Sequence, residues 1–359
     1  MVNLLKFIHL LDLLSLPLAL RADWLYRHMG QLPTTPVTKP LPKLSIILPA
    51  RNEVHNLGRS LPTLQSINYP GYFELIVVDD NSTDSTATLA EEFYTTAIRL
   101  DTLPPGWLGK PHACHQGATR ATGEWLLFTD ADVLHHPNGP ANAVRHAMQR
   151  NLDVLSLFLE HRGTNFTERL SLMVAYAGLF AGLRRLEKFI NGQYILLRRE
   201  IYQASGGFAA VRNEKLEDLA LGAHLNQLGY RIQTMRGAGA ASVKMYTDNF
   251  QLWHGMTRLS AGTLKWLGVS SLITALFTTA VISPLLNTMP KRRKNKPHGW
   301  ALLTWGITAA GFLPWARRFG SYWLALLAPL GAIPVLSAAV WGIIRQMLGR
   351  GVVWKDRIV

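Results

Sequence analysis

The sequence predicts an α/β protein whose doubly wound, mostly parallel sheet is followed by membrane-embedded helices. In the middle of the 359-residue chain, short apolar runs alternate with segments of helical pattern, which is typical of a parallel sheet with crossover helices. After residue 265 come three long stretches without charged residues, as expected of helices that enter a membrane. The net charge of +14 is not arranged as a basic patch interleaved with aromatic residues, so we expect no nucleic-acid partner.

The first 43 residues are predicted to form a helix at the membrane and a linker. Residues 4–20 are apolar except at Lys6 and Asp12, so residues 1–30 are interpreted as a membrane anchor or an interfacial helix. No small-residue cleavage site follows this run, and a cleaved signal peptide is therefore not expected. Residues 31–43 are rich in proline and are interpreted as a linker.

Residues 44–246 are predicted to form the α/β domain. Their single cysteine, Cys114, is the only one in the chain; it excludes an intramolecular disulfide and fits a reducing compartment. The predicted strands begin at Leu44, Glu74, Ala97, Trp125 and Val154. The predicted helices lie near residues 56–66, 82–93, 112–122 and 139–150.

Polar side chains follow three of the predicted strands, at the point where each strand ends. Two acids one residue apart, as in the Asp-Ala-Asp turn after the run WLLFT, are costly without a positive partner. A divalent cation that carries a phosphate would meet that need, and a solvated turn is the alternative. Because ligands of parallel sheets bind at the carboxyl ends of the strands, we expect one site at this edge. Its residues are Pro49, Arg51 and Glu53, then Asp79 and Asp80, then Asp130 and Asp132.

Several other kinds of site are disfavoured. The chain has no GxxxxGK[ST] motif and no GxGxxG after a strand, so neither a P-loop nor a dinucleotide-binding fold is expected. His112 and His115 flank Cys114, but one cysteine does not provide the paired ligands of a zinc site. The acidic run from residue 79 to residue 84 follows a strand, whereas the DDxxD motif of prenyl-diphosphate enzymes belongs on a helix.

Three motifs in order, LSIILPARNE, ELIVVDDNSTD and FTDADV, resemble the family 2 glycosyltransferases over residues 44–260. The resemblance implies a GT-A fold, a nucleotide-sugar donor and inversion of the anomeric centre. The stretches PPGWLGKPHACHQGATRATGEWLLF and GVVWKDR are similar to a membrane-bound subgroup. That subgroup contains carotenoid (diaponeurosporenoate-type) and hopanoid-associated glycosyltransferases.

The resemblance also implies roles for individual residues. Asp79 and Asp80 would bind the base and ribose of the donor, with Pro49, Arg51 and Glu53 beside them. A loop over the nucleotide would contain Gly109 and Lys110, whose ammonium would neutralise diphosphate charge. Asp130 would contact the donor sugar or ribose. Asp132, paired with Asp130, would bind Mg²⁺ or Mn²⁺, which prefer oxygen ligands.

An inverting transfer needs a base, and the candidates are Glu217 and Asp218 at the start of a predicted helix. Acids in a first helical turn are often complements of the helix dipole. The family usually has an acidic pair here whose aspartate is the base, which favours Asp218. In the close subgroup the acid also occurs at the position of Glu217, so both assignments remain open.

Residues 247–265 are predicted to form an interfacial helix. The Gln-x-x-Arg-Trp signature of processive synthases is absent there, which favours a single transfer. Trp253 and Arg258 would either reach the donor diphosphate or lie at the level of the lipid headgroups.

The sequence therefore predicts an integral membrane glycosyltransferase that moves a sugar from UDP-glucose to an isoprenoid lipid of carotenoid or hopanoid type. The alternatives are transfer to a polyprenyl phosphate or another membrane lipid, and a catalytically silent nucleotide-binding scaffold. No pattern indicates the oligomeric state.

The α/β domain is expected to face the cytoplasm, where nucleotide sugars occur. Residues 266–345 are predicted to be membrane helices and residues 346–359 a basic tail. A plain first span would place the basic run at residues 291–296 on the far side, against the positive-inside rule. A re-entrant segment at residues 266–290 would remove that conflict, and three plain spans are the alternative.

Overall fold

The computed structural model describes residues 2–93, 95–163, 165–183, 189–263, 268–288, 298–351, 353–354 and 357–358. The chain divides into two compact units. The helical unit comprises Met1–His28, Gly163–Arg184 and Met245–Val359, and the sheet unit comprises Met29–Arg162 and Arg185–Lys244. The basic run at residues 291–296 lies outside the described residues. The boundaries predicted for the anchor, the linker, the α/β domain, the interfacial helix, the membrane helices and the tail remain predictions.

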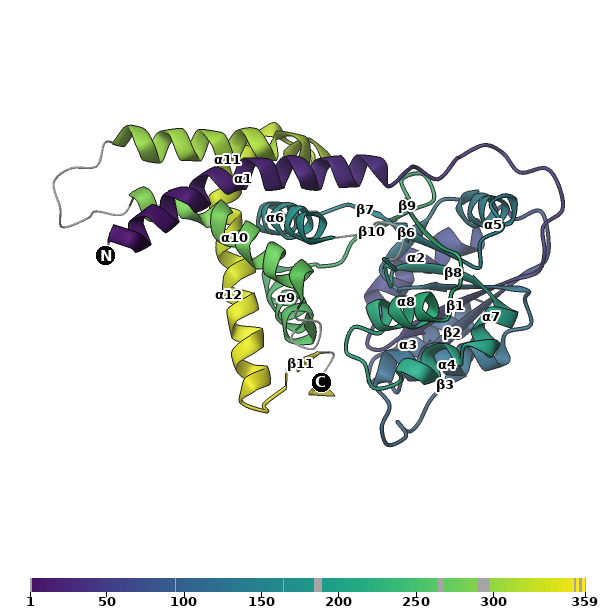
Figure 1. The fold of residues 1–359 in the computed structure, drawn as a ribbon. Coiled ribbons are helices and arrows are strands. Elements are labelled where there is room, and N and C mark those ends of the chain that lie inside the picture. The colour runs from purple at the N-terminus through teal and green to yellow at the C-terminus, as the bar shows by residue number, and fades with distance from the viewer. Residues whose placement is uncertain are drawn as a thin grey trace. The chain divides into compact units, whose positions relative to one another are not determined.

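A sheet forms the centre of the sheet unit (Figure 1). It has seven strands in the order β3-β2-β1-β4-β8-β6-β9. Neighbouring strands are parallel except at β8, which runs antiparallel to both β4 and β6. The predicted, mostly parallel α/β sheet is therefore confirmed. The strands are β1 Leu44–Ala50, β2 Phe73–Asp79, β3 Thr96–Arg99, β4 Trp125–Thr129, β6 Val154–Phe158, β8 Tyr194–Arg198 and β9 Ile232–Arg236.

A smaller sheet begins where the chain continues beyond the end of β4. It has three strands in the order β5-β10-β7. These are β5 Val133–His135, β7 Glu160–His161 and β10 Ala241–Val243. Because β5 begins directly after the Asp-Ala-Asp turn, its pairing with β10 fixes the path by which the chain leaves that turn.

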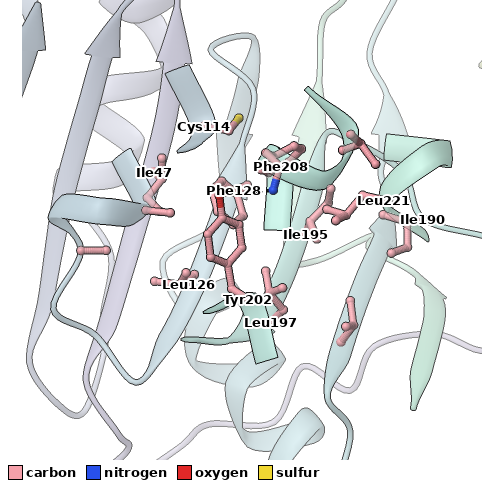
Figure 2. Packing of buried hydrophobic residues seen from close by; sticks show 14 of the residues in the cluster. Ile47, Cys114, Leu126, Phe128, Ile190, Ile195, Leu197, Tyr202, Phe208 and Leu221 are labelled. Atoms are coloured by element: carbon pink, nitrogen blue, oxygen red, sulfur yellow. Dashed lines mark hydrogen bonds between the residues drawn. The ribbon is translucent and has the colours of Figure 1, made fainter. Parts of the chain in front are cut away.

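Short helices pack on the main sheet and bury its apolar side chains. The helix α4 contacts β1 and β2 and approaches closely because Gly117 has no side chain; a Cβ there would collide with Ile47. Phe128 contacts Phe208 with ring centroids 5.0 Å apart, and Tyr202 lies 5.6 Å from Phe128 (Figure 2). The helices of this unit are α2 Val54–Gln65, α3 Thr86–Glu92, α4 Gly109–Arg120, α5 Gly139–Gln149, α7 Arg199–Ala204, the 3-10 helix η2 Gly207–Val211 and α8 Glu217–Gln227.

The helical unit contains two stretches long and apolar enough to cross a membrane, Val269–Thr288 and Tyr322–Met347. They correspond to the first and third uncharged stretches of the sequence. The second stretch lies in α11, which does not meet the same criterion among the described helices. The elements are α1 Val2–His28, α6 Phe166–Gly182, α9 Asn249–Thr263, α10 Val269–Thr288, α11 His298–Arg318, the 3-10 helix η4 Tyr322–Leu327, α12 Ala328–Met347, β11 Val353–Trp354 and β12 Arg357–Ile358.

The pair α1 and α11, which lie side by side (Figure 1), buries polar and small residues and exposes apolar ones. The buried hydroxyls of Ser15 and Thr308 form a hydrogen bond of 2.9 Å. A Cβ on Gly311 would lie 3.1 Å from Ala19, so the helices meet at small residues. Apolar side chains face outward, among them Leu302 at 74% exposure. Small, polar contacts inside and apolar side chains outside are typical of helices that pack in lipid.

Candidate active site

The ends of β1 and β2 are tied together by Arg51. Its guanidinium donates hydrogen bonds of 2.7 Å to the carbonyl oxygens of both Asp80 and Asn81. The backbone N–H of Asp80 donates to the carbonyl of Ala50 at 2.8 Å. The predicted donor-binding residue Arg51 therefore shapes the edge of the sheet through backbone contacts.

Two asparagines, each placed just after a predicted strand, turn the chain at this edge. Asn52 and Asn81 adopt left-handed backbone conformations, with φ of 49° and 54°, which asparagine tolerates better than most residues. The side-chain oxygen of Asn52 accepts a hydrogen bond of 2.8 Å from the backbone N–H of Thr83. Asparagine directly after a predicted strand was the available signal.

The acids of the first two strand ends lie close to backbone donors. Asp79 and Asp80 are buried, at 6% and 5% exposure. Asp79 accepts from the backbone N–H of Ser82 at 3.3 Å and from its hydroxyl. Glu53 stands at the start of α2, where its carboxylate accepts a 2.6 Å hydrogen bond from the side-chain amide of Asn56.

The third strand end presents Asp130 and Asp132 on a tight turn after β4. The backbone N–H of Val133 donates to the carbonyl of Asp130 at 3.2 Å. The N–H of Lys244 donates to the carbonyl of Asp132 at 3.3 Å. Both aspartates are partly buried, and the backbone contacts hold the turn between β4 and the small sheet.

Lys110 joins two predicted site residues that are far apart in the sequence. Its Nζ lies 2.7 Å from Oδ1 of Asp130 and 2.9 Å from Oε1 of Glu217. Burial alone would lower the pKa of Lys110, but the two carboxylates outweigh burial and hold the pKa well above its ordinary value. Lys110 also lies in the first turn of α4, which contains no acidic residue. A positive helix end and an ammonium group together favour an anion.

Asp218 is positioned by a loop that the sequence analysis did not identify. The backbone N–H of Gly192 donates to Oδ2 of Asp218 at 2.8 Å. Gly192 precedes β8, and because β8 is antiparallel its first residue, Tyr194, pairs with Thr129 at the end of β4. Burial, and next the charge of Glu217, raise the pKa of Asp218 to about 6. A carboxyl group with that pKa can accept a proton near neutral pH.

These residues surround a small cavity of about 10 Å³. Among the predicted site residues it brings together Pro49, Lys110, Asp130 and Glu217. Gly109 is the first residue of α4, next to Lys110. The thiol of Cys114 is buried, and burial raises its pKa well above the ordinary value, so the thiol is neutral. The lining consists of Pro49, Lys110, Cys114, Phe128, Thr129, Asp130, Gly192, Ile195, Phe208 and Glu217.

The family model described as glycosyl transferase family 2 matches residues 45–220, which contain every residue of this cavity. Residues 45–220 form a family 2 glycosyltransferase domain. The predicted family is thereby confirmed.

The glycosyltransferase domain also has curated relatives. A 4,4'-diaponeurosporenoate glycosyltransferase of Staphylococcus aureus strain MRSA252 is 31% identical over 231 residues, which are 61% of each chain. The protein of that name from strain USA300 is 30% identical over 231 residues, again 61% of each chain. The chain therefore matches about three fifths of the length of these relatives.

A solved structure has the same fold. It is a mannosyltransferase from Pyrobaculum calidifontis in complex with GDP-Man and Mn²⁺. The TM-score is 0.56 at 19% sequence identity, and the match covers 96% of this chain and 98% of that one. The predicted GT-A-type fold is thereby confirmed.

The glycosyltransferase domain offers a metal ion two carboxylates. In the part of the chain that the structure describes, no group of three or more His, Cys, Asp or Glu residues could hold a metal ion. Mg²⁺ is commonly bound by one or two carboxylates together with phosphate oxygens of the substrate. Asp130 and Asp132 fit that arrangement, in which the donor brings the remaining ligands.

Trp253 and Arg258 lie on α9 in the helical unit, so their position relative to the glycosyltransferase domain is not described. Trp253 lines an open hollow of about 430 Å³ between α9 and α12. Its other lining residues are Leu336, Ser337, Val340, Trp341 and Ile344. The surroundings of Trp253 are thus almost entirely apolar.

Proposed function

We propose that this protein is a membrane-bound, inverting glycosyltransferase that moves a sugar from a nucleotide-sugar donor to an isoprenoid lipid. The observation that carries the proposal is the meeting of Lys110, Asp130 and Glu217 at the edge of a family 2 glycosyltransferase domain, with Asp218 beside them. The arrangement combines a cationic group for a diphosphate, acids for a metal and a candidate base.

The donor is proposed to bind along the ends of β1, β2 and β4, with its base and ribose at Asp79 and Asp80. Its diphosphate lies at the N-terminus of α4, next to Lys110. Asp130 and Asp132 would hold Mg²⁺ or Mn²⁺, which when bound neutralises the diphosphate and assists its departure. The GDP-Man and Mn²⁺ in the similar mannosyltransferase support a nucleotide-sugar donor with a divalent ion. UDP-glucose is the proposed donor.

Asp218 is the proposed base. For a hydroxylated acceptor, the carboxylate of Asp218 takes the proton of the acceptor hydroxyl, whose oxygen attacks the anomeric carbon while the bond from that carbon to the diphosphate breaks. A carboxylated acceptor would attack as its carboxylate and would give Asp218 no proton to take. The raised pKa of Asp218 and its fixed position on Gly192 support this role. Glu217 is paired with Lys110, and Glu217 remains the alternative base.

The proposed acceptor is an isoprenoid lipid of carotenoid or hopanoid type. The names of the curated relatives refer to diaponeurosporenoate, which supports this class. The apolar hollow at Trp253 supports an acceptor with a long apolar body. A polyprenyl phosphate or another membrane lipid is the alternative of the same class.

Membrane attachment is supported by the two apolar helices and by the lipid-like packing of α1 and α11. We propose that the glycosyltransferase domain faces the cytoplasm. Residues 266–290 are proposed to be either re-entrant or the first of three plain spans; the continuous helix α10, long enough to cross a membrane, supports the plain span. Asn295→Cys and Lys355→Cys, each in a Cys114→Ser background, test this with an impermeant thiol reagent on intact cells. Protection of both positions until the membrane is permeabilised supports the re-entrant segment, and labelling at residue 295 in intact cells supports the plain span.

The activity itself is tested with the full chain in detergent, UDP-glucose and a membrane-lipid extract. We expect UDP release that depends on the extract and is stimulated by Mn²⁺, together with a hexose-bearing lipid detected by mass spectrometry. The variant Asp218→Asn is the control, because it should bind UDP without releasing product. UDP binding without turnover in the wild type, across the isoprenoid and other lipid fractions, would instead indicate a catalytically silent scaffold.

A further inference from the structure

We infer that Lys110 is an internal counter-ion that keeps divalent cations away from the acids of the site until the donor's diphosphate draws its ammonium away. The inference rests on the proposed function and adds an order of binding: the metal enters with the nucleotide and not before it. Lys110 lies between two carboxylates, those of Asp130 and Glu217.

The ammonium stands where a cation between these acids would stand. Lys110 belongs to α4, Glu217 to α8, and Asp130 follows the end of β4. The Nζ atom of Lys110 lies 2.7 Å from Oδ1 of Asp130 and 2.9 Å from Oε1 of Glu217. Its side chain is 30% exposed and that of Glu217 only 9%. The ion pair is therefore largely enclosed, where charges interact more strongly than on the surface.

The cavity that the ion pair lines is too small for a further ion. The cavity has about 10 Å³, which is roughly the room that a single water molecule needs. A hydrated divalent cation does not fit there while Lys110 stays in place. A second positive charge next to the ammonium would also be repelled by it.

A diphosphate changes this balance. It offers Lys110 new acceptor oxygens at the N-terminus of α4, where the helix end also favours negative charge. Once the ammonium turns to the diphosphate, Asp130 loses its positive partner and becomes available to a metal. The negative donor and the metal therefore favour each other's binding, which is a reciprocal coupling between two ligands.

The test is Mn²⁺ binding by the full chain in detergent, followed by the loss of the electron paramagnetic resonance signal of free Mn²⁺. In the wild type we expect weak binding without nucleotide and at least tenfold tighter binding with saturating UDP. Tight binding of Mn²⁺ to the nucleotide-free wild type, or an affinity that UDP leaves unchanged, would overturn the inference. Failure to bind UDP at all would instead count against the proposed function.

Variants locate the effect. Without nucleotide, Lys110→Met should bind Mn²⁺ at least tenfold more tightly than the wild type, because two carboxylates then lack their cation. Adding Asp132→Asn to Lys110→Met should remove most of that gain, because Asp132 is the other proposed metal ligand. The matched control is Lys43→Met, whose ammonium lies 4.4 Å from the ring centroid of Tyr72 and does not line the cavity; it should bind like the wild type.

Circular dichroism checks that each variant is folded, and the wild-type comparison with and without UDP decides the question if Lys110→Met does not fold. A folded Lys110→Met variant with wild-type Mn²⁺ affinity would refute the role of Lys110. An equal gain in Lys43→Met would show a general charge effect and refute it as well.

Discussion

Replacing Asp218 by asparagine is expected to abolish sugar transfer and, at the same time, to stabilise the free protein. The carboxyl group has its pKa raised to about 6 from an ordinary value of 3.8, because burial and the neighbouring charge of Glu217 disfavour its ionised form. Two pKa units correspond to about 3 kcal/mol of differential free energy. Asparagine resembles the protonated acid in size and can still accept the hydrogen bond from Gly192.

The size of this effect depends on pH. Because the pKa of Asp218 is raised in the folded state, protonation of Asp218 stabilises the folded protein. This stabilisation is fully present below the unfolded pKa of about 4 and is lost as pH rises through about 6. At pH 8 the wild type is thus penalised by up to about 3 kcal/mol relative to Asp218→Asn. At pH 4 the two proteins should be equally stable.

The assay is thermal unfolding of both proteins in the same detergent at pH 4 and pH 8, without nucleotide. We expect the Tm of Asp218→Asn to exceed that of the wild type by several degrees at pH 8 only. Transfer by the wild type should rise with pH through about 6, and the variant should lose at least about a hundredfold in rate. Glu217→Gln is the comparison, and it should reduce transfer less.

A variant that is no more stable than the wild type at pH 8 would refute the assignment of a raised pKa to Asp218. A variant that transfers sugar normally would refute its role as base. The reverse ranking, with Glu217→Gln the more damaging change, would move the base to Glu217.

Three further changes test other parts of the site. Asp132→Asn should fold and bind the membrane but lose transfer activity about a thousandfold or more, because metal assistance to the leaving group contributes several kcal/mol. Near wild-type turnover of this variant in saturating Mn²⁺ would contradict the assignment of Asp132 as a metal ligand. Gly192→Ala places a Cβ 3.0 Å from Oδ2 of Asp218, so transfer should fall while UDP affinity, measured by calorimetry, stays unchanged; a weakened UDP affinity would mean that the loop contacts the donor. Trp253→Ala should raise KM for the lipid acceptor and leave KM for the donor unchanged, and a change confined to the donor would return Trp253 to donor binding.

The sequence by itself determined five of the seven strands of the main sheet and the acids at its edge. Apolar runs such as the one ending at Phe128 form buried strands because their pattern is local, and polar residues directly after a strand lie at the sheet edge whatever the rest of the chain does. In the folded sheet β1 lies between β2 and β4, so Asp79 and Asp80 are one strand away from Asp130 at the same edge. The family motifs lie in these same short segments.

Only the tertiary structure decided which groups control those acids. The antiparallel strand β8, absent from the predicted strands, brings Gly192 to Asp218, and the packing of α4 brings Lys110 to Glu217. These contacts join segments far apart in the chain, so they depend on how helices and strands pack and not on any local pattern. The same holds for the buried pair of Ser15 and Thr308, because a polar side chain in an apolar helix does not reveal its partner until the helices meet.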